Sequence, residues 1–253
     1  MHTILLSMML LSFGFATAQK PIVKPGSYAW PTTDATNKNS SSVMLSGGAT
    51  DLSNLEVTAN VLATGKKKKV QLPTTEEHLV LVKSGVLTIT LNDSTFNLGK
   101  GSIALIMPGE KYSINNTGTV PCEFHVMKYQ SKAPVDLARG KSSGGSFVRD
   151  WNKLTFKPHD RGGVRPYFTK GTAMSKRFEM HVTTLNEGKI SHPPHTHRPE
   201  EIILVLEGNV DILIGDNRYK GQSGVVLFLP SNLPHGLIND GMGQCTYFAY
   251  QWE

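Results

Sequence analysis

Residues 188–208 read GKISHPPHTHRPEEIILVLEG, and residues 224–239 read GVVLFLPSNLPHGLIN. Each segment joins histidine to an apolar run of strand length beside a turn glycine. Side chains two residues apart on a strand point to the same face, so we expect a strand to aim both histidines of the HTH triplet into a barrel interior. Three imidazoles and one carboxylate suit one divalent metal ion. The candidate ligands are His195, His197, Glu201 and His235.

The N-terminus has the pattern of a secretory signal. Residues 1–18 contain no Lys, Arg, Asp or Glu and hold an apolar run from Ile4 to Phe15, followed by Ala-Thr-Ala. The run is too short to span a bilayer and ends in a small-x-small cleavage pattern, although an uncleaved anchor is the alternative. No later stretch is long and apolar enough to cross a membrane. We therefore expect a mature protein that is soluble and secreted or periplasmic.

Charge says little about partners. The net charge is +6, and four positive charges come from the run Lys66 to Lys69. No aromatic or arginine residues alternate with these lysines, as they do in nucleic-acid-binding faces. We interpret the run as a solvated loop tip and expect a small-molecule ligand or substrate rather than nucleic acid.

An internal repeat divides the rest of the chain in two. When the sequence is shifted against itself by 123 positions, five glycines, both cysteines and three further pairs of polar residues coincide. The pairs are Gly48/Gly171, Glu56/Glu179, Gly65/Gly188, Glu77/Glu200, Gly85/Gly208, Gly101/Gly224, Asn116/Asn239, Gly118/Gly241 and Cys122/Cys245. Each copy has short apolar runs between Gly, Asn and Asp turns and almost no helical periodicity, which is typical of antiparallel sandwiches or barrels. We predict an all-β protein of two tandem barrels.

The repeat also sets the expected boundaries. The strands predicted in the first copy are Val80–Val82, Val86–Leu91 and Ile103–Met107, and those in the second are Ile203–Val205, Asn209–Ile214 and Val225–Leu229. We expect an N-terminal tail or arm over 19–42, a first barrel over 43–130, a linker over 131–150 and a second barrel over 151–253.

The cysteines fall on equivalent strands of the two copies. Export would permit a disulfide between Cys122 and Cys245. Bridging requires the two strands to meet at a pseudo-twofold axis, because the Cα atoms must lie within about 7 Å. Two buried free thiols are the alternative.

Two motifs resemble those of the cupin superfamily. Its first motif contains Gly, His-x-His, Glu and Gly, matched here by Gly188, His195, His197, Glu201 and Gly208, with a spacer one residue longer than usual. Its second motif is matched by Gly224, Pro230, His235 and Asn239, with Asn232 where glycine is usual. The resemblance implies that both barrels are jelly rolls of the double-stranded β-helix type.

The first copy keeps none of the candidate ligands. Subtracting 123 from their numbers gives Leu72, Thr74, His78 and Tyr112. A divalent site needs several convergent donors, so we interpret the lone His78 as a barrel or rim residue. The first barrel is therefore predicted to be metal-free and to pack against or shape the second.

A metal-free first cupin barrel followed by a metal-loaded second one resembles the ureidoglycine aminohydrolase group of bicupins, over about residues 43–253. In that group the second barrel typically binds manganese through Glu, His, His and Gln, so the ligand positions agree here while three donor types differ. The Tyr and Lys that contact substrate there would fall near Ile212 and Gln251, which argues against ureidoglycine as substrate. The likeness also implies a homodimer through edge strands, with a monomer as the alternative.

The ligand set suits several reactions. A six-coordinate ion keeps two positions for substrate and water or dioxygen. Mn(II) and Fe(II) fit the donors, and Zn(II), Ni(II) and Co(II) could occupy the same site. We expect a metal-dependent hydrolase, isomerase or dioxygenase acting on a small polar molecule such as a sugar acid or other carboxylate. The alternative is a binding or storage-type bicupin in which the metal only orients a ligand.

Three more residues are candidates for catalysis or substrate binding. His192 precedes two prolines that would hold it at the barrel mouth, as a general base or as a solvated loop histidine. Arg177 and His181 share the polar face of a strand predicted over 178–185. If that face points inward, both would line the pocket and could bind an anionic substrate; the apolar face filling the barrel is the alternative. Secondary candidates on the last strand are Tyr247, Tyr250 and Gln251.

Overall fold

A computed structural model of the chain describes residues 20–32, 38–69 and 74–253. The predicted signal peptide lies outside the described residues, as does Leu72. None of the helices in these ranges is long and apolar enough to cross a membrane. The regular secondary structure of the described residues is almost entirely β-strand, which confirms the predicted fold class.

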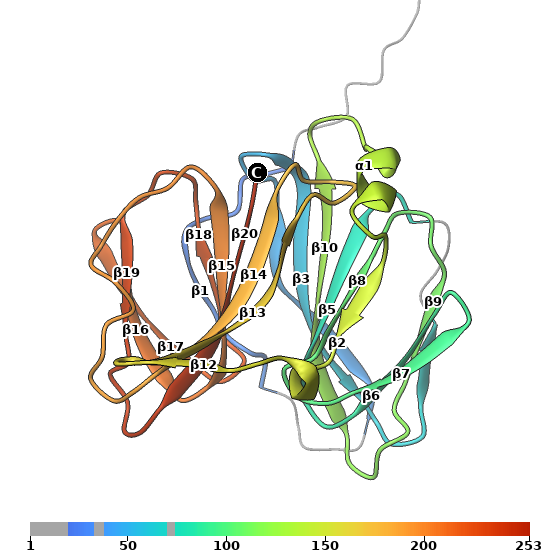
Figure 1. Cartoon of the computed structure of the whole chain (residues 1–253), viewed down its shortest axis with the longest axis horizontal. Coiled ribbons are helices and arrows are strands. Elements are labelled where there is room, and N and C mark those ends of the chain that lie inside the picture. The colour runs from blue at the N-terminus through green and yellow to red at the C-terminus, as the bar shows by residue number, and fades with distance from the viewer. Residues whose placement is uncertain (1–19, 33–37, 70–73) are drawn as a thin grey trace, which may run out of the picture.

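The first half of the chain forms a barrel of two antiparallel sheets (Figure 1). Its large sheet has the order β11 (Phe147–Arg149), β8 (Ile103–Ile106), β5 (Glu77–Ser84), β10 (Cys122–Ser131), β3 (Leu52–Leu62) and β2 (Ser40–Gly47). The small sheet has the order β4 (Lys67–Lys69), β9 (Tyr112–Asn115), β6 (Leu87–Leu91) and β7 (Ser94–Leu98). The interpretation of the lysine run as a loop tip is wrong for residues 67–69, because this segment pairs with β9 as the edge strand of the small sheet.

The second half repeats this architecture. Its large sheet has the order β1 (Gly26–Tyr28), β18 (Val226–Leu229), β15 (Glu200–Glu207), β20 (Cys245–Trp252), β14 (Phe178–Leu185), β13 (Gly162–Lys170) and β12 (Lys157–His159). The small sheet has the order β17 (Asn217–Gln222), β16 (Asn209–Ile214) and β19 (His235–Ile238). All six strands predicted from apolar runs form, as β5, β6, β8, β15, β16 and β18.

A strand from outside each barrel extends its large sheet. The segment before the first barrel adds a strand to the second barrel, and the segment between the barrels adds a strand to the first. β1 lies in the segment expected to be an arm and pairs with β18 of the second barrel. β11 lies in the segment expected to be a linker and pairs with β8 of the first barrel. The remaining helical turns, α1 (Leu137–Ser142) and the 3-10 helix η1 (Trp151–Lys153), flank β11. β1 therefore covers the edge of β18, and β11 covers the edge of β8. Covering these edges prevents other chains from pairing with them.

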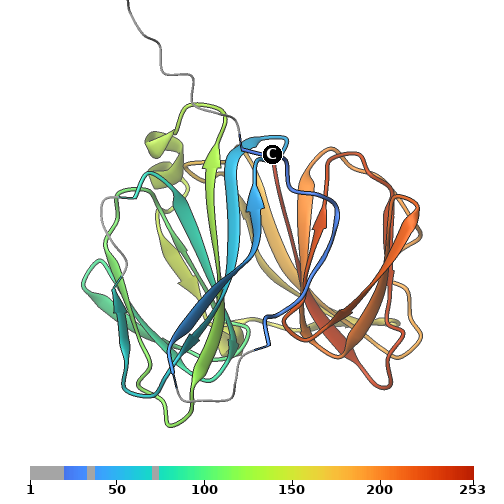
Figure 2. The ribbon, with the colours of Figure 1, turned by 180° about the vertical axis from the view of Figure 1, so that it is seen from behind.

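The two large sheets face each other across the largest apolar cluster of the protein (Figures 1 and 2). This cluster draws on both halves of the chain, including Leu79 and Met127 from the first and Phe178 and Trp252 from the second. Each barrel also has its own interior cluster. On β14 the apolar side chains face the other barrel, so the alternating polar face, which carries His181, points into the second barrel.

The repeat extends to individual hydrogen bonds. Asn116 is fully buried, donates to two backbone carbonyls, and accepts from the N–H of Gly118. Asn239 makes the corresponding bonds 123 positions later and accepts from Gly241. The two cysteines also occupy equivalent strands, but each is buried in the interior of its own barrel. Cys122 and Cys245 are free thiols, which settles the alternative left open by the sequence.

Candidate metal centre

The histidines of the HTH triplet lie in a loop, so the prediction that a strand carries them is wrong. β15 begins only at Glu200, because the prolines at 193, 194 and 199 lack the N–H that a ladder needs. One isolated antiparallel pairing survives, in which His195 and His235 exchange two backbone hydrogen bonds of 3.0 Å each. Directly opposed residues place their side chains on the same face, and the two rings lie 4.6 Å apart between centroids.

A turn from the other motif fixes His197. The carbonyl of His197 accepts a 2.8 Å hydrogen bond from the backbone N–H of Asn232. Asn232 has a φ of 59°, in the left-handed region that asparagine tolerates better than most residues. This explains how the chain departs from the usual glycine at this position without losing the turn.

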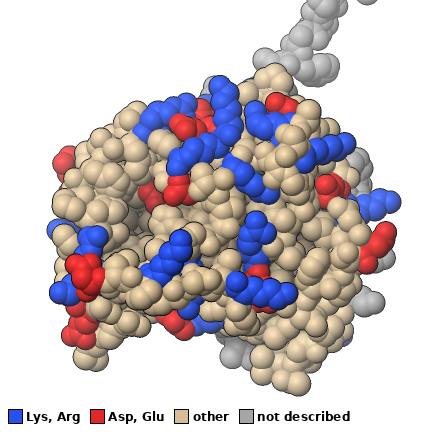
Figure 3. All heavy atoms as spheres, in the orientation of Figure 1, with Lys and Arg blue, Asp and Glu red and all other residues tan. Residues whose placement is uncertain are grey.

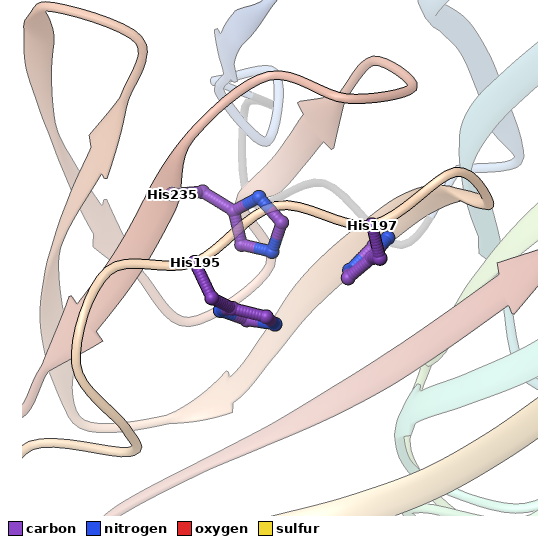
Figure 4. Close-up of side chains that lie close together, drawn as sticks. All are labelled: His195, His197 and His235. Atoms are coloured by element: carbon purple, nitrogen blue, oxygen red, sulfur yellow. The ribbon is translucent and has the colours of Figure 1, made fainter.

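Three of the four candidate ligands converge on one point, and the fourth, Glu201, contacts two of them. Figure 4 shows the three imidazoles turned toward one another, and their ligand nitrogens all lie within 4.8 Å of one another. The carboxylate of Glu201 lies beside two of these rings: Oε2 is 3.1 Å from Nε2 of His197 and 3.6 Å from Nε2 of His235. Donors about 2.1 Å from one ion lie about 3 to 4 Å apart, so small side-chain movements suffice for shared coordination.

The hydrogen bonds behind the rings fix which nitrogens are free. Nδ1 of His197 donates to the carbonyl of Pro199 at 2.8 Å, and Nδ1 of His235 donates to that of Leu233 at 2.9 Å. A carbonyl can only accept, so both Nδ1 atoms carry protons and both Nε2 atoms are available as ligands. Nε2 of His235 is buried without a hydrogen-bond partner among the described residues. A divalent ion would satisfy this nitrogen, so the donor set fits a metal.

Electrostatics in the metal-free protein agree with that assignment. Glu201 raises the pKa of His197 through its hydrogen bond, against a smaller opposing effect of burial. Burial lowers the pKa of His195 and His235, and the neighbouring imidazoles lower it further. The hydrogen bond to Glu201 thus favours the protonated form of His197, whereas burial favours the neutral forms of His195 and His235, which are the forms that bind a metal ion.

The ligands open onto a cavity of about 210 Å³ in the second barrel. Its other polar lining residues are His181, Ser191, His192, Tyr247 and Gln251. Its apolar lining residues are Ile203, Ile212, Leu229, Leu237 and Ala249. No Lys or Arg of the described chain lines this cavity. A ligand would therefore be small and would meet a half-polar, half-apolar wall.

The structure separates the catalytic candidates. His192 lines the cavity, with its ring 4.1 Å from that of His195, and His181 lines it from β14. Arg177 lies outside the cavity, where its guanidinium pairs with Glu179 and its backbone N–H donates to the carbonyl of Glu253 at 3.2 Å. The expectation that Arg177 would bind an anionic substrate in the pocket thus has no structural support.

The secondary candidates divide by strand alternation. Tyr247 and Gln251 line the cavity, whereas Tyr250 points into the core between the barrels. Sequence reasoning missed Ser191, which hydrogen-bonds Tyr247. No residue pattern marks Ser191, because it belongs to a loop whose position depends on pairing with β19.

At the positions of the first barrel that are equivalent to the candidate ligands, the side chains hydrogen-bond to one another. His78 is only 3% exposed and bonds through Nδ1 to the hydroxyl of Tyr112 at 2.9 Å and through Nε2 to Thr74 at 3.3 Å. Both ring nitrogens are therefore engaged within the protein. Among the described residues, the cluster in the second barrel is the one group of three or more His, Cys, Asp or Glu side chains placed to hold a metal.

Comparisons with known proteins agree with the fold. Residues 181–249 match the model of the cupin domain, and residues 73–153 match that of the AraC-like ligand-binding domain. No curated protein matches the chain.

Three solved structures illustrate the similarity. A putative glyoxylate-induced protein from Pseudomonas aeruginosa is 21% identical, with a TM-score of 0.65 over 84% of this chain and 80% of that one. AerE from Microcystis aeruginosa is 17% identical, with a TM-score of 0.64 over 92% of this chain and 98% of that one. An oxalate decarboxylase from Lactobacillus farciminis, in complex with formate, is 13% identical, with a TM-score of 0.62 over 79% of this chain and 77% of that one. At these identities the likeness establishes the fold alone.

Proposed function

Because the chain has the fold of a two-barrel cupin protein, we propose that its second barrel binds one divalent metal ion and uses it as an enzyme acting on a small polar molecule. One observation carries the proposal. Nε2 of His235 is buried without a protein partner, and it faces His195, His197 and Glu201 at the wall of a cavity. A buried nitrogen without a partner is costly unless something binds it.

The cavity residues would have different roles around the proposed ion. The three imidazoles and Glu201 would hold Mn(II) or Fe(II), with Zn(II), Ni(II) or Co(II) as alternatives. When bound, such an ion polarises a substrate oxygen or lowers the pKa of a bound water. His181 and His192 line the cavity and would move protons there, and Gln251 would orient a polar substrate.

The cavity also limits the substrate. Its volume of about 210 Å³ suits a short molecule, and among the described residues no cationic side chain lines it. A carboxylate would therefore be recognised by the ion and the imidazoles rather than by an Arg or Lys clamp. Small sugar acids and other short carboxylates remain the favoured class, and hydrolysis, isomerisation and oxidation remain the reaction types that the ligands permit.

Elemental analysis tests the metal site. Protein purified without chelators or metal-affinity resin should contain about one equivalent of a divalent metal. The His195→Ala/His197→Ala variant should lose it, whereas Thr74→Ala/His78→Ala, a double change at the first-barrel positions equivalent to His197 and Glu201, should retain it. Wild-type protein that stays metal-free after incubation with Mn(II), Fe(II), Zn(II), Ni(II) and Co(II) would contradict the proposal.

A second function, metal-assisted binding without catalysis, has one observation in its favour. Residues 73–153, most of which lie in the first barrel, match the model of the AraC-like ligand-binding domain. A panel of small carboxylates and sugar acids separates the two functions. Turnover by the metal-loaded protein supports the enzyme, and tight binding of one compound without turnover supports the binding protein.

We also propose that the protein is exported. The apolar run and the Ala-Thr-Ala sequence at 16–18 support cleavage after Ala18. N-terminal sequencing of the protein from the native host should then begin at Gln19. An intact N-terminus on protein recovered from the cytoplasm would contradict export.

A further inference from the structure

We infer that the first barrel positions the metal-ligand segment of the second. The segment is residues 197–201, which contains the proposed ligands His197 and Glu201, and the positioning contact is the turn at Thr50 and Asp51 of the first barrel. This inference rests on the proposed metal site. It assigns Thr50, Asp51 and their partners the role of positioning residues.

Side chains in residues 197–201 point in two directions. His197 and Glu201 line the cavity of the second barrel. Arg198 and Glu200 instead contact the first barrel: Thr50 N–H donates to Oε1 of Glu200 at 2.7 Å. The two residues that contact the first barrel therefore lie between the two proposed ligands in the sequence.

The Glu200 contact is buried. Glu200 is 1% exposed, and its Oε2 has no hydrogen-bond partner among the described residues. The Thr50 N–H is therefore the principal donor to this buried carboxyl group. Losing such a contact is costly, because the oxygen would be left without water or a protein donor.

The Arg198 contact lies at the surface. Its guanidinium binds both carboxylate oxygens of Asp51, and the Nη2–Oδ1 distance is 2.8 Å. Both residues line a cleft of about 560 Å³ between the barrels. Figure 3 shows Lys and Arg gathered over the upper part of this junction with Asp and Glu among them. An exposed bidentate pair constrains geometry more than it adds stability.

The second barrel holds the same segment from its other side. Asn232 N–H binds the carbonyl of His197 at 2.8 Å, and the hydroxyl of Ser231 binds the carbonyl of Arg198 at 2.5 Å. These two residues lead into the strand that carries His235. The segment 197–201 is therefore fixed between the first barrel and the turn that supplies the remaining ligand.

The repeat supplies an internal comparison. Glu77 and Ala173 are the counterparts of Glu200 and Thr50 after exchange of the barrels, and Ala173 N–H donates to Oε1 of Glu77 at 3.3 Å. Here the buried carboxyl group precedes His78, which is not a ligand. The same kind of contact therefore exists twice, and only one copy adjoins a proposed metal site.

The test measures the dissociation constant for Co(II) and the visible absorption spectrum of the Co(II) protein, on the full chain. Glu200→Met removes the acceptor and should weaken Co(II) binding about tenfold to a hundredfold and alter the spectrum. Glu200→Gln keeps an oxygen acceptor for Thr50 N–H and should restore both. Asp51→Ala removes the ion pair to Arg198 and should weaken binding in the same direction by a smaller factor.

Two control variants break contacts between the barrels away from the ligands. Glu77→Met removes the repeat-related contact, and Lys100→Ala removes the ion pair to Glu207 at the far end of β15. Both should bind Co(II) as wild type does, even where stability falls. Equal Co(II) affinity and spectra in wild type, Glu200→Met and Asp51→Ala would overturn the inference while leaving the metal site intact. A wild-type protein that binds no metal would overturn both.

Discussion

Glu201 faces two imidazole nitrogens whose partner nitrogens already donate to backbone carbonyls. In the metal-free protein the hydrogen bond to Glu201 favours the protonated imidazole and raises the pKa of His197. A metal ion binds only the deprotonated nitrogen. Metal affinity should therefore rise with pH, as expected wherever a ligand must be deprotonated before it binds.

His181 is the cavity-lining histidine best placed for proton transfer away from the metal. It lies on β14, and its Nδ1 is 3.7 Å from Oε1 of Glu179, whose other oxygen pairs with Arg177. A carboxylate beside an imidazole orients the ring for proton transfer. We predict that His181→Gln lowers kcat about 100-fold with the metal content unchanged. Steady-state kinetics on a substrate found in the panel, combined with elemental analysis, measures both quantities.

The matched control for this prediction is Tyr250→Phe. Tyr250 lies on the strand next to β14 but faces the core between the barrels. This change should leave kcat near the wild-type value. If His181→Gln also retained wild-type kcat, His181 would be a wall residue without a chemical role.

Strands with long apolar runs were predictable, and the shortest elements were not. β5, β15 and β18 are buried on both faces, so their sequences are continuous apolar runs between turn residues. β1 and β11 have only three residues each, and they exist because the edges of β18 and β8 accept them. Such pairing depends on tertiary structure, which no local pattern encodes.

The candidate site was also only partly predictable from the sequence. The ligand types and their spacing identified the four metal-binding candidates, but three nearby prolines exclude the strand on which the histidines were expected. The direction of the polar face of β14 stayed open in the sequence, because either face could have filled the barrel. The contact between Thr50 and Glu200 joins residues 150 positions apart, and no spacing rule indicates it.

The turn before β19 depends on the left-handed conformation of Asn232. Its side chain is exposed, so the backbone conformation decides the effect of a substitution. We predict that Asn232→Gly changes the free energy of unfolding by less than about 1 kcal/mol, whereas Asn232→Val lowers it by about 1–2 kcal/mol. Denaturant unfolding of the metal-free proteins measures both values.

Gly109, the counterpart of Asn232, provides the control. It has a φ of 78° in the first barrel. Gly109→Val should also lower stability but should leave the metal content unchanged, whereas Asn232→Val should reduce metal affinity through the turn that binds His197. Equal stability of Asn232→Gly and Asn232→Val would show that the turn can avoid the left-handed conformation.

The two barrels form one structural unit. Their large sheets share the largest apolar cluster, and each barrel lends a strand to the sheet of the other. Neither large sheet could keep its outer face buried without its partner, because both contribute large apolar side chains to that cluster. This dependence explains why a barrel without metal ligands is an integral part of the molecule.

A buried histidine makes this junction sensitive to acid. His125, on β10, is 2% exposed; its Nε2 donates to the carbonyl of Gly224 in the second barrel at 3.1 Å, and its Nδ1 has no partner in the described chain. The ring packs edge-on against Trp30 of the N-terminal segment. Burial lowers the pKa of His125 to about 4, and Lys83 adds to this effect against Glu123 and the Gly224 hydrogen bond.

We predict that this histidine weakens the fold as the pH falls. The folded pKa of about 4 lies below the ordinary value of 6.5, so the unfolded chain takes up the proton first. Its contribution to stability is complete above about pH 6.5 and is lost progressively between about pH 6.5 and 4. A pH of 5.0 lies about 1.5 units below the ordinary pKa of 6.5, which corresponds to a loss of about 2 kcal/mol in the free energy of unfolding. Denaturant unfolding at pH 7.5 and 5.0 measures how far the free energy of unfolding falls between these pH values. This decrease should be about 2 kcal/mol smaller in His125→Gln than in wild type, and the amide of the variant can still donate to the carbonyl of Gly224. Carboxylates elsewhere titrate in both proteins and cancel in this comparison, so an equal drop in wild type and variant would mean that the junction admits the proton without penalty.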